Sequence, residues 1–209
     1  MFTVWAGACA VPSPQDLHAA LLARYQELSS FFAEVEEIMT FGSNIVSQPQ
    51  KIWFSAPRVR IERVGQDEET GYPLLEIRDA AQRKSWYLLE AGVWEEEEGW
   101  EFQEPLSLLA LGLGFLLEFV PEEVSEEPRD GEVLLILRGR AGKMEVTLWL
   151  DPETLFIRQA VRGGQGLTWT HVVKEFQVGV EVAEDLFQPP SPQEIARIFK
   201  LSLEGMEIA

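Results

Sequence analysis

Residues 133–178 decide the fold class, and they read VLLILRGRAGKMEVTLWLDPETLFIRQAVRGGQGLTWTHVVKEFQV. From Met144 to Leu150 apolar side chains fall on every second residue, which is the period of a β-strand with one buried face. Three more extended runs lie beside this one, and the linkers between them are short and contain Gly, Pro or Asp. Extended runs joined by such linkers predict the hairpins of an antiparallel meander.

The same pattern continues toward the N-terminus. Phe31, Ala33 and Val35 alternate with a second set of side chains, so we expect a strand there. Pro57 interrupts a longer extended run, because proline cannot donate a hydrogen bond to a neighbouring strand. Including these, we expect strands before the meander at residues 31–36, 52–64, 74–78, 85–89 and 93–97.

Two other stretches have a helical period. An apolar stripe predicts an amphipathic helix over residues 17–29, with Asp16 as its N-cap. A short terminal helix is expected after Pro192. Because the first helix must bury its stripe against another element, the sequence predicts a mainly β protein with helices, of the α+β class.

Residues 106–120 (LSLLALGLGFLLEFV) differ from the rest of the chain, because they are almost entirely apolar and interrupt the strands. The segment is too short to span a bilayer, so we expect a buried helix or a helix that covers a binding site. Gly112 and Gly114 weaken it as a helix, and replacing them with alanine is expected to stiffen it and slow ligand exchange. The flanking stretches Glu95–Glu98 and Glu122–Glu127 are expected to be solvated hairpin tips and loops.

Composition and charge exclude several classes of function. The 209 residues include 35 Asp and Glu against 17 Lys and Arg, which gives a formal net charge of −18. A nucleic-acid partner is not expected, because binding to phosphates depends on a basic surface. We expect one domain over residues 15–200, with a flexible N-terminal segment at 1–14 and a C-terminal tail at 201–209.

The sequence contains no pattern that predicts catalysis. His18 and His171 have no neighbours at the spacing of a metal site or a catalytic triad, and the glycine-rich residues 163–166 lack the helix and lysine of a phosphate loop. Cys9 is the only cysteine, so an internal disulfide and a multi-cysteine metal site are both excluded. We therefore predict no enzyme activity, no cofactor and no metal.

Cys9 has a second possible meaning. The residues before it, Ala6-Gly7-Ala8, are small, as they are before the acylated cysteine of a bacterial lipoprotein signal, and Pro12 and Pro14 follow in a tether-like stretch. Lipidation at Cys9 would anchor the protein to a membrane. The alternative is an ordinary N-terminus that happens to hold one cysteine.

Several motifs, taken in order, resemble a known family. They are WFSAPRVRIE at residues 53–62, LEIRD at 75–79, SWY at 85–87, VTLWLDP at 146–152 and LFQPP at 186–190. In this order they are similar to the LolA/LolB-type lipoprotein carriers and their outer-membrane lipoprotein-sorting relatives. That family places an arginine before the proline, where it holds the helical lid, but this chain has Ala56 there.

The resemblance implies a half-open antiparallel β-barrel with a helical lid over an apolar cavity. It implies no catalysis, and a location outside the cytoplasm, in the periplasm or cell envelope. Arg58 and Arg60 are candidates for the lid contact that Ala56 cannot make. The candidate cavity residues are inward aromatic side chains and lid leucines: Phe32, Val35, Trp53, Trp86, Leu88, Leu109, Leu113, Leu116, Phe119 and Trp149.

Two functions follow from the resemblance. In the first, the protein binds or carries lipids or the acyl chains of lipoproteins. In the alternative, the same fold is a cell-envelope sensor or interaction domain, and its partner is a protein, such as a membrane protein. A lipid that co-purifies favours both of these over a third possibility, an enzyme on the same scaffold, whereas a co-purifying protein that dissociates when lipid is added favours the second over the first.

Overall fold

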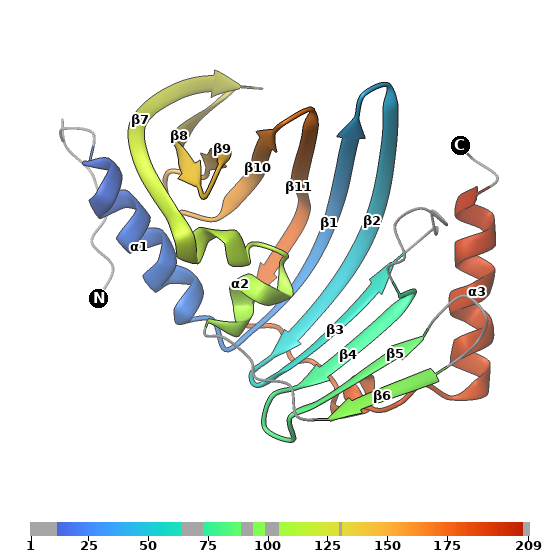
Figure 1. Ribbon diagram of the computed structural model, residues 1–209. Coiled ribbons are helices and arrows are strands. Elements are labelled where there is room, and N and C mark those ends of the chain that lie inside the picture. Colours follow the sequence, from blue (N-terminus) through green and yellow to red (C-terminus); the bar gives the residue numbers. More distant parts are fainter. Residues whose placement is uncertain (1–11, 64–72, 89–93, 99–104, 130, 207–209) are drawn as a thin grey trace.

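The computed structural model describes residues 12–63, 73–88, 94–98, 105–129 and 131–206 (Figure 1). Cys9 and most of the expected N-terminal segment lie outside the described residues. In the described ranges the strands are β1 (Ser30–Phe41), β2 (Asn44–Ser55), β3 (Arg58–Arg63), β4 (Leu75–Asp79), β5 (Lys84–Leu88), β6 (Trp94–Glu98), β7 (Phe119–Arg129), β8 (Glu132–Ala141), β9 (Met144–Leu150), β10 (Ile157–Gly164) and β11 (Leu167–Val178). The helices are α1 (Pro14–Gln26), α2 (Leu106–Ala110) and α3 (Pro192–Met206), with short 3₁₀ helices η1 (Gly114–Glu118) and η2 (Glu184–Phe187).

All eleven described strands belong to one antiparallel sheet, in the order β6-β5-β4-β3-β2-β1-β11-β10-β9-β8-β7. Strands that follow one another in the chain are paired, except β6 and β7, and the long β1–β11 ladder joins the first half of the chain to the second. The edge strands β6 and β7 are not paired with each other, so the sheet stays open. The predicted half-open antiparallel sheet with covering helices is therefore confirmed.

The connection between the two edge strands contains the covering helices. The chain leaves β6, forms α2 and η1, and enters β7, so this connection crosses from one edge of the sheet to the other. In Figure 1 the strongly bent sheet partly surrounds α2, which lies near the centre. We call residues 106–118 the lid.

The lid is not one helix, because the chain bends at Gly112. This residue has φ +70°, a left-handed conformation that glycine adopts without steric cost, and it ends α2 and separates it from η1. The strand β7 then begins at Phe119, within the segment that was expected to be helical. The apolar composition of residues 106–120 correctly indicated burial, but Gly112 divides the segment into two short helices.

The glutamate-rich stretches are edge strands and not loops. Residues 122–127 lie in β7, and residues 95–98 lie in β6. An edge strand exposes unpaired backbone groups, and charged side chains and proline discourage pairing with another chain there. Pro121 and Pro128 in β7 fit this role. The strand expected at residues 93–97 is therefore confirmed as β6, whereas the expectation of solvated hairpin tips and loops was wrong about the backbone at both stretches.

Helix α1 begins three residues earlier than expected, at Pro14, and its N-cap is Ser13. The Ser13 Oγ accepts a hydrogen bond from the backbone N–H of Asp16, and the Ser13 hydroxyl donates to the Asp16 carboxylate. Proline is favoured in the first turn because its fixed φ suits a helix and its missing N–H has no partner there. The predicted cap at Asp16 is therefore part of the first turn.

Each face of the sheet has its own core. On the inner face, α1 and the lid pack against apolar side chains of β1, β2, β3 and β7–β11, including Phe31, Ile52 and Leu148. On the outer face, η2 and α3 pack against β4 and β5, where Phe187 and Ile198 belong to one buried cluster with Ile77 and Trp86. Figure 1 shows α3 on the side of the sheet away from α1 and α2.

Within the described part of the chain, no helix combines the length and the apolar character that crossing a membrane requires. The predicted terminal helix is confirmed as α3, which extends to Met206 and so includes most of the expected tail.

Candidate functional site

The lid seals the inner face of the sheet with apolar side chains. Leu108, Leu111, Leu113 and Leu116 are at most 1% exposed, and all belong to the inner core. Beneath them lies an aromatic cluster in which Phe31 stacks on Phe54 at 5.0 Å between ring centroids. Apolar burial is not directional, so it holds the lid on the sheet without fixing its orientation.

Polar contacts of the lid with the rest of the protein are few. The backbone hydrogen bonds between α2 and η1 stay within the segment. Among the described residues, two hydrogen bonds that involve a side chain leave the lid, and both go to α1: the Ser107 hydroxyl donates to the Tyr25 carbonyl at 2.6 Å, and His18 Nε2–H donates to the Leu116 carbonyl at 3.0 Å. The side chain of His18 also meets the Phe119 ring edge-on.

Burial around this contact lowers the pKa of His18, although its hydrogen bond to the Leu116 carbonyl opposes the shift. The neutral imidazole is therefore the form that the folded protein favours. Protonation would weaken the packing where α1 supports η1.

Two hollows border the lid. One lies between the lid turn and strands β1, β10 and β11, and we call it the inner cleft; its lining residues are Glu37, Gly112, Phe115, Ala160, Arg162, Trp169, Thr170 and His171. The second lies between α2 and strands β2–β4. Their empty volumes, about 280 and 240 Å³, are below the usual range of ligand pockets. With the lid closed, a long acyl chain does not fit either hollow.

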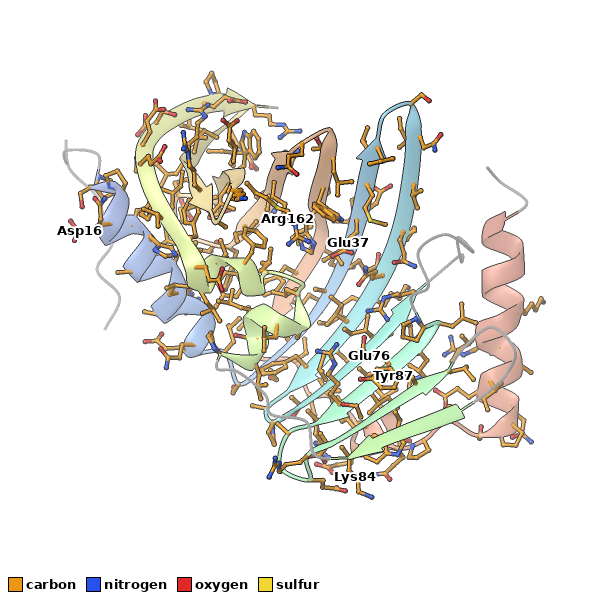
Figure 2. The ribbon with its side chains drawn as sticks, in the orientation of Figure 1. Asp16, Glu37, Glu76, Lys84, Tyr87 and Arg162 are labelled. Atoms are coloured by element: carbon orange, nitrogen blue, oxygen red, sulfur yellow. The ribbon has the colours of Figure 1, made fainter. Side chains whose placement is uncertain are left out.

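The inner cleft contains a cluster of polar side chains. The sheet register places Glu37 of β1 directly beside His171 of β11, and Arg162 of β10 opposite Trp169. Figure 2 shows Glu37 and Arg162 near each other, beside the lid. The His171 Nδ1 lies 3.7 Å from the Glu37 Oε1, which is close enough for an ion pair but too far for a hydrogen bond.

The charges around Glu37 favour its ionised form. Burial raises the pKa of the carboxyl, but His171, Arg63 and Arg162 outweigh that effect and hold the pKa below its usual value. The lid turn lies directly against the carboxylate, since a Cβ added to Gly112 would be 2.8 Å from the Glu37 Oε1. A side chain at position 112 would therefore push against Glu37.

Arg162 lies between two aromatic rings. Its guanidinium carbon is 4.6 Å from the centroid of the Trp169 ring and 5.1 Å from that of Phe115. Phe115 belongs to the lid and Trp169 to the sheet, so the arginine joins the two. These contacts are cation–π interactions.

The predicted cavity residues are distributed over three places. Val35, Leu113, Leu116 and Phe119 belong to the inner core, and Leu109 borders the second hollow. Trp86 and Leu88 lie in the outer core, and Phe32, Trp53 and Trp149 lie on the outer face of their strands. Phe32 contacts Trp53 at 5.4 Å between ring centroids. The structure thus brings the lid residues together with Val35 but separates them from the tryptophans, because neighbouring residues of a strand point to opposite faces.

Arg58 and Arg60 bind the C-terminal segment and not the lid. Arg58 forms a bidentate ion pair with Glu184 at 2.7 and 2.8 Å, and its guanidinium lies over the Phe187 ring. Arg60 is fully buried and donates hydrogen bonds to Glu62, to Glu194 and to the Leu186 carbonyl. Arg58 also lines the second hollow together with residues of α2, and this shared hollow is where Arg58 lies near the lid.

The sequence reasoning did not include Glu37, Arg162 and Trp169 among the site residues, and it treated His171 as structural. One signal was present in β1, where the alternation Phe31, Ala33, Val35 leads to Glu37 at the next inward position. A carboxylate at a position where the pattern expects an apolar side chain indicates a polar site on the inner face. Arg162 and Trp169 become its neighbours only through the register of β10 and β11.

No protein-family model and no curated protein matches the sequence. Among solved structures, an uncharacterised conserved protein of Thermus thermophilus matches with a TM-score of 0.57 and 12% identity, over 88% of this chain and 97% of that one. MucB in the Pseudomonas aeruginosa MucA/MucB complex matches with a TM-score of 0.52 and 15% identity, over 86% of this chain and 62% of that one. A LolA superfamily protein, NE2245 from Nitrosomonas europaea, matches with a TM-score of 0.44 and 11% identity, over 82% and 97%.

The chain therefore shares its overall fold with the Thermus thermophilus protein and with MucB, and a LolA superfamily protein is among the structural matches, as the sequence resemblance predicts. At these identities the likeness concerns the fold alone.

Proposed function

We propose that this protein binds an acyl chain, of a lipid or of a lipoprotein, between the lid and the inner face of the sheet. The observation that carries the proposal is the way the lid is held. Its buried leucines occupy the inner face, and within the described ranges the side-chain hydrogen bonds that join the lid to the body of the protein lead to α1 alone. An acyl chain could therefore replace these leucines on the sheet without breaking a sheet hydrogen bond.

The energetics of such an exchange are close to balanced. Burial of an acyl chain contributes about 0.8 kcal/mol for each CH₂ group. Displacing the lid exposes four leucines, each of which loses about 2 kcal/mol of burial if it is not covered elsewhere. A chain of ordinary length repays that loss with a small surplus, which suits a protein that must also release its ligand.

The proposal also concerns location. The fold likeness supports a role outside the cytoplasm, in the periplasm or cell envelope, and a binding role in place of catalysis. Anchoring through Cys9 stays a prediction. Replacement of Cys9 by serine in the full-length gene tests it, because loss of membrane association is expected only if the cysteine carries lipid.

Hydrogen–deuterium exchange with and without 1-tetradecanol, a neutral acyl-chain probe, tests the binding mode. Native mass spectrometry first establishes the stoichiometry of the complex. We then expect faster amide exchange in residues 106–118 when the ligand is bound, because the chain displaces the lid. Residues 192–198 of α3 should be unaffected. Binding with unchanged or slower exchange in the lid would place the ligand elsewhere and refute the proposal.

A second function is supported by one comparison. MucB, which shares the fold, was solved in a complex with MucA, so a protein partner is the alternative role. Affinity purification from the native host distinguishes the two. A partner that is released by tetradecanol supports a sensor that responds to acyl chains, whereas a partner that is indifferent to it supports a protein-interaction domain alone.

A further inference from the structure

The inner cleft holds two polar side chains, His171 and Arg162, that make no hydrogen bond with the described residues. His171 is only 7% exposed and lines the cleft; its Nδ1 lies 3.7 Å from the Glu37 Oε1, and neither ring nitrogen has a hydrogen-bond partner among the described residues. A buried polar group in this condition is unusual and indicates an unfilled binding role, because the missing bond costs free energy in the folded protein.

Arg162 is the second such side chain. Its guanidinium carbon lies over the rings of Phe115 and Trp169. Within the described part of the chain, no carboxylate lies within ion-pair distance of Arg162. Its contacts with the two rings are cation–π interactions, so its N–H groups remain available to a ligand in the cleft.

The charges that face the cleft come from three strands. Glu37 of β1 is negative and Arg162 of β10 is positive, and His171 of β11 lies beside Glu37. Arg63 of β3 adds positive potential at Glu37. The lid contributes Gly112 and Phe115, which carry no charge. Glu37 lies toward His171 and the lid turn, whereas Arg162 is held by the aromatic rings.

We infer that the inner cleft binds the anionic headgroup of the ligand, a carboxylate or a phosphate, through Arg162 and His171. This inference rests on the proposed function, since the acyl chain attached to the headgroup would lie under the adjoining lid. The planar fork of an arginine matches two oxygens of either group, and charge-assisted hydrogen bonds are stronger than neutral ones. The imidazole N–H of His171 supplies a further donor.

Three ligands of equal chain length separate the headgroup from the chain: tetradecanoate, 1-tetradecanol and tetradecyl phosphate. Each displaces an apolar fluorescent probe from the full chain. We expect the two anions to bind about tenfold or more tightly than the alcohol, in line with the strength of charge-assisted hydrogen bonds. The anion that binds more tightly shows whether the cleft recognises the carboxylate of a fatty acid or a phosphate headgroup.

Variants locate this preference in the cleft. Arg162→Gln should remove it, because the variant should weaken binding of the two anions far more than binding of the alcohol. Arg140→Gln, the control, makes the same charge change at an exposed residue of β8 that pairs with Glu122 outside the cleft. It should keep the preference. Glu37→Gln should strengthen binding of the anions a few-fold, because it removes a like charge near the headgroup.

The failures of the two proposals are distinguishable. If no ligand binds, the acyl-chain function itself is refuted. If all three ligands bind equally well to the native chain, only the headgroup site is refuted, and this comparison needs no variant to fold. An equal loss for alcohol and anions in Arg162→Gln would assign the arginine to holding the lid and would also overturn the inference.

Discussion

Helical segments cover both faces of the sheet, but different kinds of contact hold them in place. On the outer face, the fully buried Arg60 donates hydrogen bonds to Glu62, Glu194 and the Leu186 carbonyl, which fixes η2 and α3 in one orientation. On the inner face, leucines cover the sheet, and the lid has two hydrogen bonds to α1. Directional ion pairs specify a fixed layer, whereas apolar contacts permit one apolar group to replace another.

The largest effect is expected on the outer face. Arg60→Met should lower the free energy of unfolding by about 3–5 kcal/mol, because Glu62 and Glu194 would lose a buried partner. Urea denaturation measures this change. As a control, Arg60→Met combined with Glu62→Leu should recover part of the loss. A single-variant cost below about 1 kcal/mol would contradict the view that ion pairs fix this layer.

The next prediction compares matched cavities on the two faces. Leu116→Ala in the lid and Ile198→Ala in α3 each remove a buried side chain, and each should cost about 2–4 kcal/mol. Tetradecanol should raise the melting temperature of Leu116→Ala, because its acyl chain fills the space left on the inner face. It should raise the melting temperature of Ile198→Ala by less. Equal restoration would show that the faces do not differ in ligand binding.

The third prediction concerns the lid turn. Gly112→Ala and Gly142→Ala should each lose about 1 kcal/mol, because both residues have positive φ. Only the first also pushes against Glu37, whereas a Cβ at Gly142 meets no atom within 4 Å. Urea denaturation should therefore show a larger loss of unfolding free energy for Gly112→Ala than for Gly142→Ala. An equal loss would show that the contact with Glu37 does not destabilise the variant.

The left-handed backbone also changes an expectation from the sequence. Alanine at position 112 strains the closed lid instead of stiffening it, so acyl ligands should exchange faster in Gly112→Ala. Stopped-flow release of the fluorescent probe measures this rate. Gly114 has no positive φ, and its added Cβ would meet the Leu109 side chain at 2.7 Å within the lid.

The smallest effect is a pH dependence at His18. Because burial holds the folded-state pKa below the unfolded value of about 6.5, the unfolded chain binds the proton more readily. The stability that neutral His18 contributes is therefore fully present above about pH 6.5. It is lost as the pH falls from there through the lower pKa of the folded state. In His18→Gln this part of the pH slope of unfolding should disappear, and an unchanged slope would exclude His18 as its source.

Much of the fold was predictable because it depends on local patterns. The alternation from Met144 to Leu150 predicted β9 at its observed limits, and the run 167–178 predicted β11. The apolar composition of residues 106–120 indicated the covering segment. The strand β7 was missed because its glutamates and prolines suggest a loop, and only pairing with β8 makes it a strand.

The candidate site was less predictable, because it depends on which face a residue occupies and on which strands are neighbours. The sequence alone determined the antiparallel hairpins, the amphipathic first helix and the leucine-rich lid, since these follow from side-chain period and turn residues. Only the tertiary structure decided that Arg60 lies opposite the lid and that Glu37, His171 and Arg162 share a cleft. A shift of one residue reverses the face of a side chain, and the β1–β11 ladder joins residues more than 100 positions apart.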